Sequence, residues 1–113
     1  MTTPPTPPET LFHITAEENM VPIYMDGFKA VFGNYFSSTI ENAGRFIAIR
    51  SMFDPEQKWV AFEIETNGLK VELSHDHSPE FFGTDDSWVI WGDIGPEHIV
   101  NVYEVTFGKE VTT

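Results

Sequence analysis

A histidine and a threonine lie two residues apart in the segment Leu11-Phe12-His13-Ile14-Thr15. Side chains two apart on a β-strand point to the same face, so His13 and Thr15 should lie together. A histidine can donate a hydrogen bond to a hydroxyl group of a ligand. The alternative is a histidine at a strand end that bonds a nearby carbonyl and contacts no ligand.

Signals for the start of a helix follow this strand directly. Thr15 can cap the first turn, and Glu18 can complete a capping box. We expect a helix from about residue 16 to residue 26 that ends at Gly27, although Pro22 leaves its far end open. Its buried residues should be Met20, Ile23 and Tyr24. Free N–H groups at the helix start make this junction a candidate binding site.

Tyr35 lies in a second strand-like segment that also runs into a helix, from residue 33 to residue 38. Ser38 and Glu41 form another capping-box pattern, so a second helix should begin here. We prefer a helix beyond residue 45, where a strand is the alternative. The phenol of Tyr35 could offer a flat face to a heterocycle, or it could be an ordinary core aromatic.

A β-hairpin is expected from Lys58 to Ser74. Apolar and polar residues alternate from residue 58 to residue 66, and Asn67-Gly68 favours a two-residue type I′ turn. That register places Ile64 opposite Val71.

Later segments complete an expected mainly antiparallel sheet. Residues 75–86 indicate a long loop, residues 87–91 a strand, and Val100 to Phe107 the last strand. The expected core face of the last strand consists of Asn101, Tyr103, Val105 and Phe107. The fold class is therefore α+β, with two short N-terminal helices on a mainly antiparallel sheet.

Composition limits the classes of partner. The chain has 113 residues, six basic and eighteen acidic side chains, a formal charge of −12 and no cysteine. Such a charge disfavours direct binding to nucleic acids and favours basic protein partners. No leader or long apolar run is evident, so we expect a cytoplasmic protein without a membrane segment. Residues 1–10 should be a disordered proline-rich tail and residues 11–108 a single domain.

Two other groups of residues have more ordinary explanations. His75 and His77, with acidic neighbours, could suggest a metal site, but no third ligand has a fixed spacing, and we predict none. Trp88 and Trp91 should lie on opposite faces of a strand, with at least one in the core.

The order of these segments resembles the ADP-ribosyltransferase fold of the histidine–tyrosine–glutamate class, which includes DNA-modifying toxins and RNA 2′-phosphotransferases. The resemblance extends from about Leu11 to Phe107, and its motifs are residues 11–15, residues 33–37 and the closing residues 91–100. It implies NAD as cofactor. By position, His13 would bond the adenosine ribose, and the Ile14 backbone would hold the nicotinamide carboxamide.

The same resemblance assigns the remaining contacts to NAD. Tyr35 would stack on the nicotinamide ring, Thr15 would orient His13 or the ribose, and Ser37 belongs to the same site. An active transferase also carries a glutamate at the start of the late strand, which stabilises an oxocarbenium-like transition state. Here Ser87 occupies that position. Asp85 and Asp86 precede it as the candidate catalytic carboxylates.

Two functions remain open at this point. The first is a small NAD-dependent mono-ADP-ribosyltransferase that acts on a protein target. The second is a catalytically inactive acidic binding module, of a phage or mobile-element type, that inhibits a host protein, with nucleic-acid mimicry as one route. A third alternative is an unrelated α+β domain.

Overall fold

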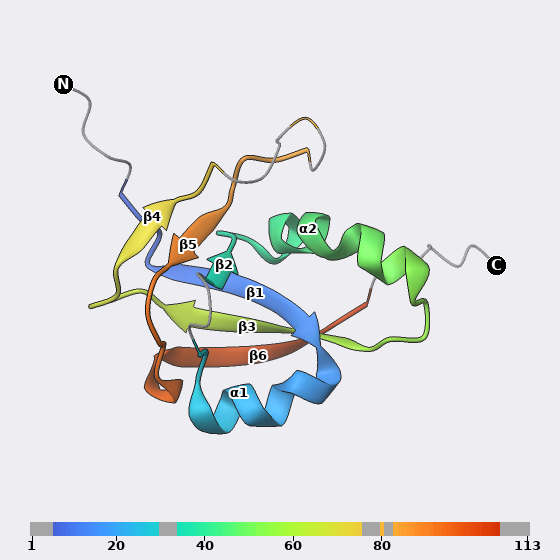
Figure 1. The fold of residues 1–113 in the computed structure, drawn as a ribbon, viewed down its shortest axis with the longest axis horizontal. Coiled ribbons are helices and arrows are strands. Elements are labelled where there is room, and N and C mark those ends of the chain that lie inside the picture. The colour runs from blue at the N-terminus through green and yellow to red at the C-terminus, as the bar shows by residue number, and fades with distance from the viewer. Residues whose placement is uncertain (1–5, 30–33, 76–79, 81–82, 107–113) are drawn as a thin grey trace.

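Two small antiparallel sheets and two helices make up the part of the chain that the computed structural model describes, which is residues 6–29, 34–75, 80 and 83–106. The first sheet contains β1 (Thr10–Ala16), β3 (Trp59–Glu65) and β6 (Ile99–Val105), in the order β1-β3-β6. The two helices lie on opposite sides of this sheet (Figure 1).

β3 is the central strand of the first sheet, and it is covered on both faces. Val60, Phe62 and Ile64 are at most 2 % exposed on one face, while Trp59 and Ala61 are at most 5 % exposed on the other. A strand covered on both faces contributes apolar side chains to two separate cores. One core lies against the second helix, and the other lies against the first helix and the second sheet.

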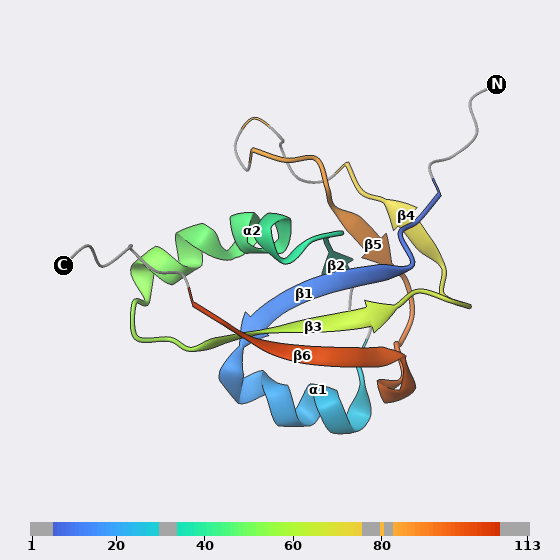
Figure 2. The same ribbon diagram turned by 180° about the vertical axis from the view of Figure 1, so that it is seen from behind.

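The second sheet contains β2 (Asn34–Phe36), β5 (Trp88–Ile90) and β4 (Val71–Leu73), in the order β2-β5-β4. A single bridge between Phe12 of β1 and Ser37, just after β2, joins the two sheets. Figure 2 shows this sheet at one end of the longer strands.

The hairpin expected between residues 58 and 74 is wrong. β3 pairs with β1 and β6, so both of its edges are occupied, and β4 pairs with β5 instead. A turn does form, because the Leu69 N–H donates to the Thr66 carbonyl at 2.9 Å. Gly68 has φ +81°, but no non-glycine residue in the described ranges has positive φ, whereas a type I′ turn needs it at Asn67 as well. The turn therefore separates the strands.

The first helix begins later than expected. β1 continues to Ala16, a 3₁₀ turn covers Glu17–Asn19, and α1 spans Met20–Asp26. The expected capping box at Thr15 is wrong. The residue at the cap position is Ala16, whose side chain makes no cap bond. Pro22 is tolerated because it lies in the first turn, where N–H groups have no partner within the helix.

The end of α1 agrees with the sequence. Gly27 has φ +77°, and its N–H donates to the Ile23 carbonyl at 2.7 Å. Met20 and Ile23 pack on the core, but Tyr24 is 59 % exposed, so its expected burial is wrong.

α2 (Ile40–Phe53) confirms the helix preferred beyond residue 45. Its N-cap is Thr39, whose hydroxyl accepts from the Asn42 N–H at 3.1 Å, and the expected pair of Ser38 and Glu41 is not the cap. Ser38 instead bonds Asp86. The helix has 14 residues, so only α1 is short.

The core face expected for the last strand is wrong in part. Val102 packs on the core, while Asn101 is exposed and Tyr103 is 39 % exposed. The register of β3 and β6 shifts between Glu63 and Ile64, which changes the alternation that the sequence suggested. Phe107 lies outside the described residues.

The expected tail and domain boundary are only partly within the described chain. Residues 1–5 and 107–108 lie outside it. Thr10 already belongs to β1, and Thr66 donates to the carbonyl groups of Pro8 and Glu9. The fold class is α+β, as expected, with two sheets in place of one. No helix in the described chain is long and apolar enough to span a bilayer.

Candidate functional site

On the edge of β1 that faces away from β3, a gap begins where the chain turns from β2 into α2. Phe12 and Ser37 exchange two backbone hydrogen bonds, of 2.7 and 2.9 Å, and the chain then turns into α2. In an antiparallel ladder the backbone groups of alternate residues point to the same edge. The N–H and C=O of Ile14 therefore point, like those of Phe12, away from β3. They face the gap between β1 and α2.

A hollow of about 270 Å³ lies at this gap. Its lining comes from β1, the β2 segment, α2 and the residue before β5: Phe12, His13, Ile14, Tyr35, Phe36, Ser37, Ala43, Phe46, Ile47, Arg50 and Ser87. Five of the residues predicted from the sequence, from three distant segments, are thus brought to one cavity. These five are His13, Ile14, Tyr35, Ser37 and Ser87.

His13 is held in one orientation by its neighbours. Its ring packs against Phe28 and Phe36, with centroids 5.4 and 5.3 Å away, and Nδ1 lies 2.7 Å from the Tyr35 carbonyl oxygen. Because a carbonyl only accepts, Nδ1 carries the proton. Burial lowers the pKa of His13 below its ordinary value of 6.5, and the bond to Tyr35 opposes part of this shift. In the neutral ring, Nε2 is an acceptor.

The candidate carboxylate Asp86 lies beside the hollow and does not line it. Its Oδ2 accepts from the Ser38 N–H at 2.9 Å, from the Ser38 hydroxyl at 2.7 Å and from Asn42 Nδ2 at 2.9 Å. Its Oδ1 accepts from Trp88 Nε1 at 3.0 Å. Four hydrogen bonds thus fix this carboxylate between the start of α2 and β5.

The other candidate residues near Asp86 differ in burial. Ser87, which the resemblance places where an active transferase has its glutamate, is 2 % exposed and lines the hollow. Asp85 is exposed and does not line it, and its backbone carbonyl accepts from the Ser87 N–H at 2.8 Å. The described lining of the hollow therefore contains no carboxylate.

Thr15 lies at the end of β1, outside the lining. Its hydroxyl accepts from Asn19 Nδ2 at 3.0 Å. This contact ties the end of the strand to the 3₁₀ turn and gives Thr15 a local structural partner. His77, one of the two histidines considered for a metal site and not predicted to form one, lies outside the described residues. Among the described residues there is no group of three metal-ligating side chains.

Sequence reasoning missed the contribution of α2 to the hollow. Ala43, Phe46, Ile47 and Arg50 have the spacing of one helical face, but this spacing alone does not show which strand the face packs on. The Arg50 guanidinium carbon lies 5.3 Å from the centroid of the Trp59 ring, within the range of a cation–π contact. It is the cation in the lining of the hollow.

No family model matches the sequence, and no curated protein matches it.

The chemistry of the hollow follows from its lining. Phe12, Phe46 and Ile47 supply apolar surface, and Ile14 supplies a backbone donor and acceptor. Arg50 supplies a positive charge. This combination suits a ligand that has a flat heterocycle with an amide group in one part and a phosphate in another.

Proposed function

We propose that the hollow binds the nicotinamide end of NAD and that the chain is a small ADP-ribosyltransferase-like protein. The observation that carries the proposal is the direction of the Ile14 N–H and C=O, which face a cavity shared with Tyr35 and His13. A carboxamide has one acceptor oxygen and two donor hydrogens, so it can pair with both backbone groups. Tyr35 then offers a face for the pyridine ring.

The size of the cavity limits what it can enclose. About 270 Å³ is slightly below the usual range for sites that enclose drug-sized ligands. It suits a nicotinamide with its ribose and not a whole dinucleotide. The pyrophosphate would then lie towards Arg50, whose charge opposes the repulsion expected from a net charge of −12.

We propose binding without transfer of ADP-ribose. Cleavage of the nicotinamide–ribose bond develops positive charge on the sugar, and a nearby carboxylate stabilises it. Ser87 has no charge to supply, and Asp86 would have to leave four hydrogen bonds to enter the hollow. The supported function is therefore a nucleotide-dependent binding module with a protein partner, and transfer to that partner is an outcome of the test.

Calorimetry with NAD, ADP-ribose and nicotinamide tests the proposal. All three ligands should bind, and Arg50→Gln should weaken NAD and ADP-ribose by roughly 3- to 10-fold, the loss expected for one exposed charge-assisted contact. Nicotinamide has no phosphate, so its affinity should not change. Arg45→Gln is the matched control, because Arg45 is also exposed on α2 but does not line the hollow.

Absence of heat with all three ligands at millimolar concentration would overturn the nucleotide site. Incubation with NAD and a chromatographic assay for free nicotinamide tests catalysis separately. We expect no release above the rate of NAD alone. Release that disappears in Asp86→Asn would instead establish an enzyme and assign the carboxylate.

A further inference from the structure

A second and larger cavity, of about 980 Å³, lies at the start of β3, near Trp59, where α2 ends. We call it the acidic groove. Its lining comes from the end of α2, the connection to β3, the start of β3, the end of β6 and the residue after β1: Glu17, Ser51, Met52, Asp54, Pro55, Glu56, Gln57, Lys58, Trp59, Glu104, Val105 and Thr106. None of these residues lines the hollow.

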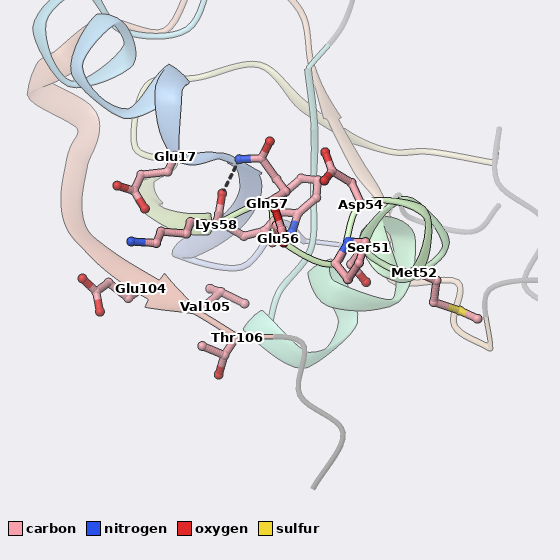
Figure 3. Close-up of a pocket in the computed structure, with 12 residues that line it drawn as sticks. Glu17, Ser51, Met52, Asp54, Glu56, Gln57, Lys58, Glu104, Val105 and Thr106 are labelled. Atoms are coloured by element: carbon pink, nitrogen blue, oxygen red, sulfur yellow. Dashed lines mark hydrogen bonds between the residues drawn. The ribbon is translucent and has the colours of Figure 1, made fainter. Parts of the chain in front are cut away.

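The groove combines an apolar floor with a charged rim. Trp59 is 5 % exposed, and Val105 is partly buried, so they form a fixed base. Met52 is 79 % exposed on the last turn of α2, and Figure 3 shows its thioether at the side of the groove away from Glu17. Phe53, the neighbour of Met52, is 86 % exposed. Such exposure of large apolar side chains is typical of a contact surface.

The rim carries four carboxylates and one ammonium group in the described lining: Glu17, Asp54, Glu56, Glu104 and Lys58. The four acids come from three separate segments of the chain, and Figure 3 shows the end groups of Glu17 and Glu104 on either side of Lys58. Their combined field attracts cations and repels phosphates.

The backbone around the rim is held by hydrogen bonds. The Glu17 N–H donates to the Lys58 carbonyl at 2.9 Å, and Gln57 Nε2 donates to the same carbonyl at 2.7 Å. The Gln57 N–H donates to the Asp54 carbonyl at 3.1 Å. A rim fixed in this way loses little conformational entropy when a ligand binds.

We propose that the acidic groove binds an extended segment of a protein partner in which lysine or arginine side chains flank an apolar residue. The apolar residue would contact Trp59, Val105 and Met52, and the cations would pair with the rim carboxylates. A nucleic acid or an anionic membrane would meet repulsion at the same rim. The proposal goes beyond the nucleotide site and does not depend on it.

Fluorescence anisotropy with a labelled nonapeptide, in which lysine and arginine flank a central leucine, is the direct test. The wild-type chain should bind this peptide but not a peptide with glutamine at every basic position. The double variant Glu17→Gln with Glu104→Gln should bind about fivefold more weakly or worse, as expected for the loss of two rim charges. Raising the salt from about 0.05 M to about 0.5 M should weaken wild-type binding steeply.

The matched control is the double variant Glu9→Gln with Glu65→Gln. It has the same net charge, but both residues lie near the opposite end of β3. Equal losses in the two double variants would overturn the groove in favour of a general charge effect. If the peptide binds only after removal of residues 107–113, the C-terminal residues are the occupant of the groove. If sedimentation shows a dimer that the Glu17 and Glu104 changes abolish, the occupant is a second copy of the chain. Either result would contradict a separate partner.

Discussion

At the scale of single residues, Asp86 accepts four hydrogen bonds beside the hollow. Its two oxygens join the loop before α2, the helix itself and β5 through Ser38, Asn42 and Trp88. A carboxylate bound in this way fixes the position of its neighbour Ser87 in the wall of the hollow. Asp86 therefore supports the hollow from behind its lining.

Asp86→Ala should lower the free energy of unfolding by about 2–4 kcal/mol, because four donor groups lose a charged acceptor. Asp85→Ala changes an exposed side chain next to it and should alter stability by no more than about 0.5 kcal/mol. Urea titration of both variants measures the difference. Similar midpoints for the two would show that the Asp86 contacts contribute little.

His13 predicts a pH dependence of stability. Burial lowers the pKa of its ring in the folded chain, so below pH 6.5 the unfolded chain binds a proton that the folded chain does not. The contribution of the neutral His13 ring to the free energy of unfolding is fully present above that pH. The free energy of unfolding should fall as the pH decreases below it, by at most about 1.4 kcal/mol per pH unit for one proton. Urea midpoints between pH 7 and about pH 5 measure it.

His13→Asn is the matched variant, since its side-chain amide can still donate to the Tyr35 carbonyl but does not titrate. The slope between pH 6.5 and about pH 5 should decrease in this variant relative to the wild type. The control is His98→Asn. The His98 ring lies at the other end of the sheet and bonds the Glu65 carbonyl. An unchanged slope in His13→Asn would contradict the inferred neutral ring.

At the scale of elements, the stop of α1 depends on a close backbone approach. Gly27 has φ +77°, and the following residue, Phe28, exchanges two hydrogen bonds of 2.8 Å with Ile94. A Cβ at Gly27 would collide with the Ile94 carbonyl oxygen. The glycine thus permits both the helix end and the contact of α1 with the segment before β6.

Gly27→Ala should destabilise the chain by more than about 3 kcal/mol, because backbone strain adds to a clash that backbone atoms cannot relieve. Gly92→Ala is matched in conformation, with φ +93°, but nothing lies within 4 Å of its Cβ position. It should cost only about 1 kcal/mol. Thermal unfolding of the two variants separates the clash from the strain, and equal losses would refute the clash.

The elements were predictable where the signal was local. Gly27 signals a helix end because a residue without a Cβ adopts positive φ readily, and the helical stripe of α2 is visible in the spacing of Ile40, Ala43 and Ile47. Strand partners were not predictable in this way. The alternation of residues 59–65 shows that a strand forms, but hydrogen-bond partners depend on segments distant in the chain.

At the scale of the whole molecule, the grouping of His13, Ile14, Tyr35 and Ser37 around the hollow was predictable from the sequence. The contribution of α2 was not, because it depends on how the helix crosses β1. The acidic groove was not predictable either. Its four carboxylates are dispersed from Glu17 to Glu104 in the sequence, and only the packing of β3 and β6 beside the end of α2 brings them together.

The contact between Arg50 and Trp59 has a consequence for both cavities. Arg50 lines the hollow, Trp59 forms the floor of the acidic groove, and the two side chains stack on each other. A phosphate that drew the guanidinium away would remove the cation from the indole on which the proposed peptide would rest. Thermodynamic coupling through such a shared wall is reciprocal, so any factor by which a nucleotide changes peptide affinity is the factor by which the peptide changes nucleotide affinity.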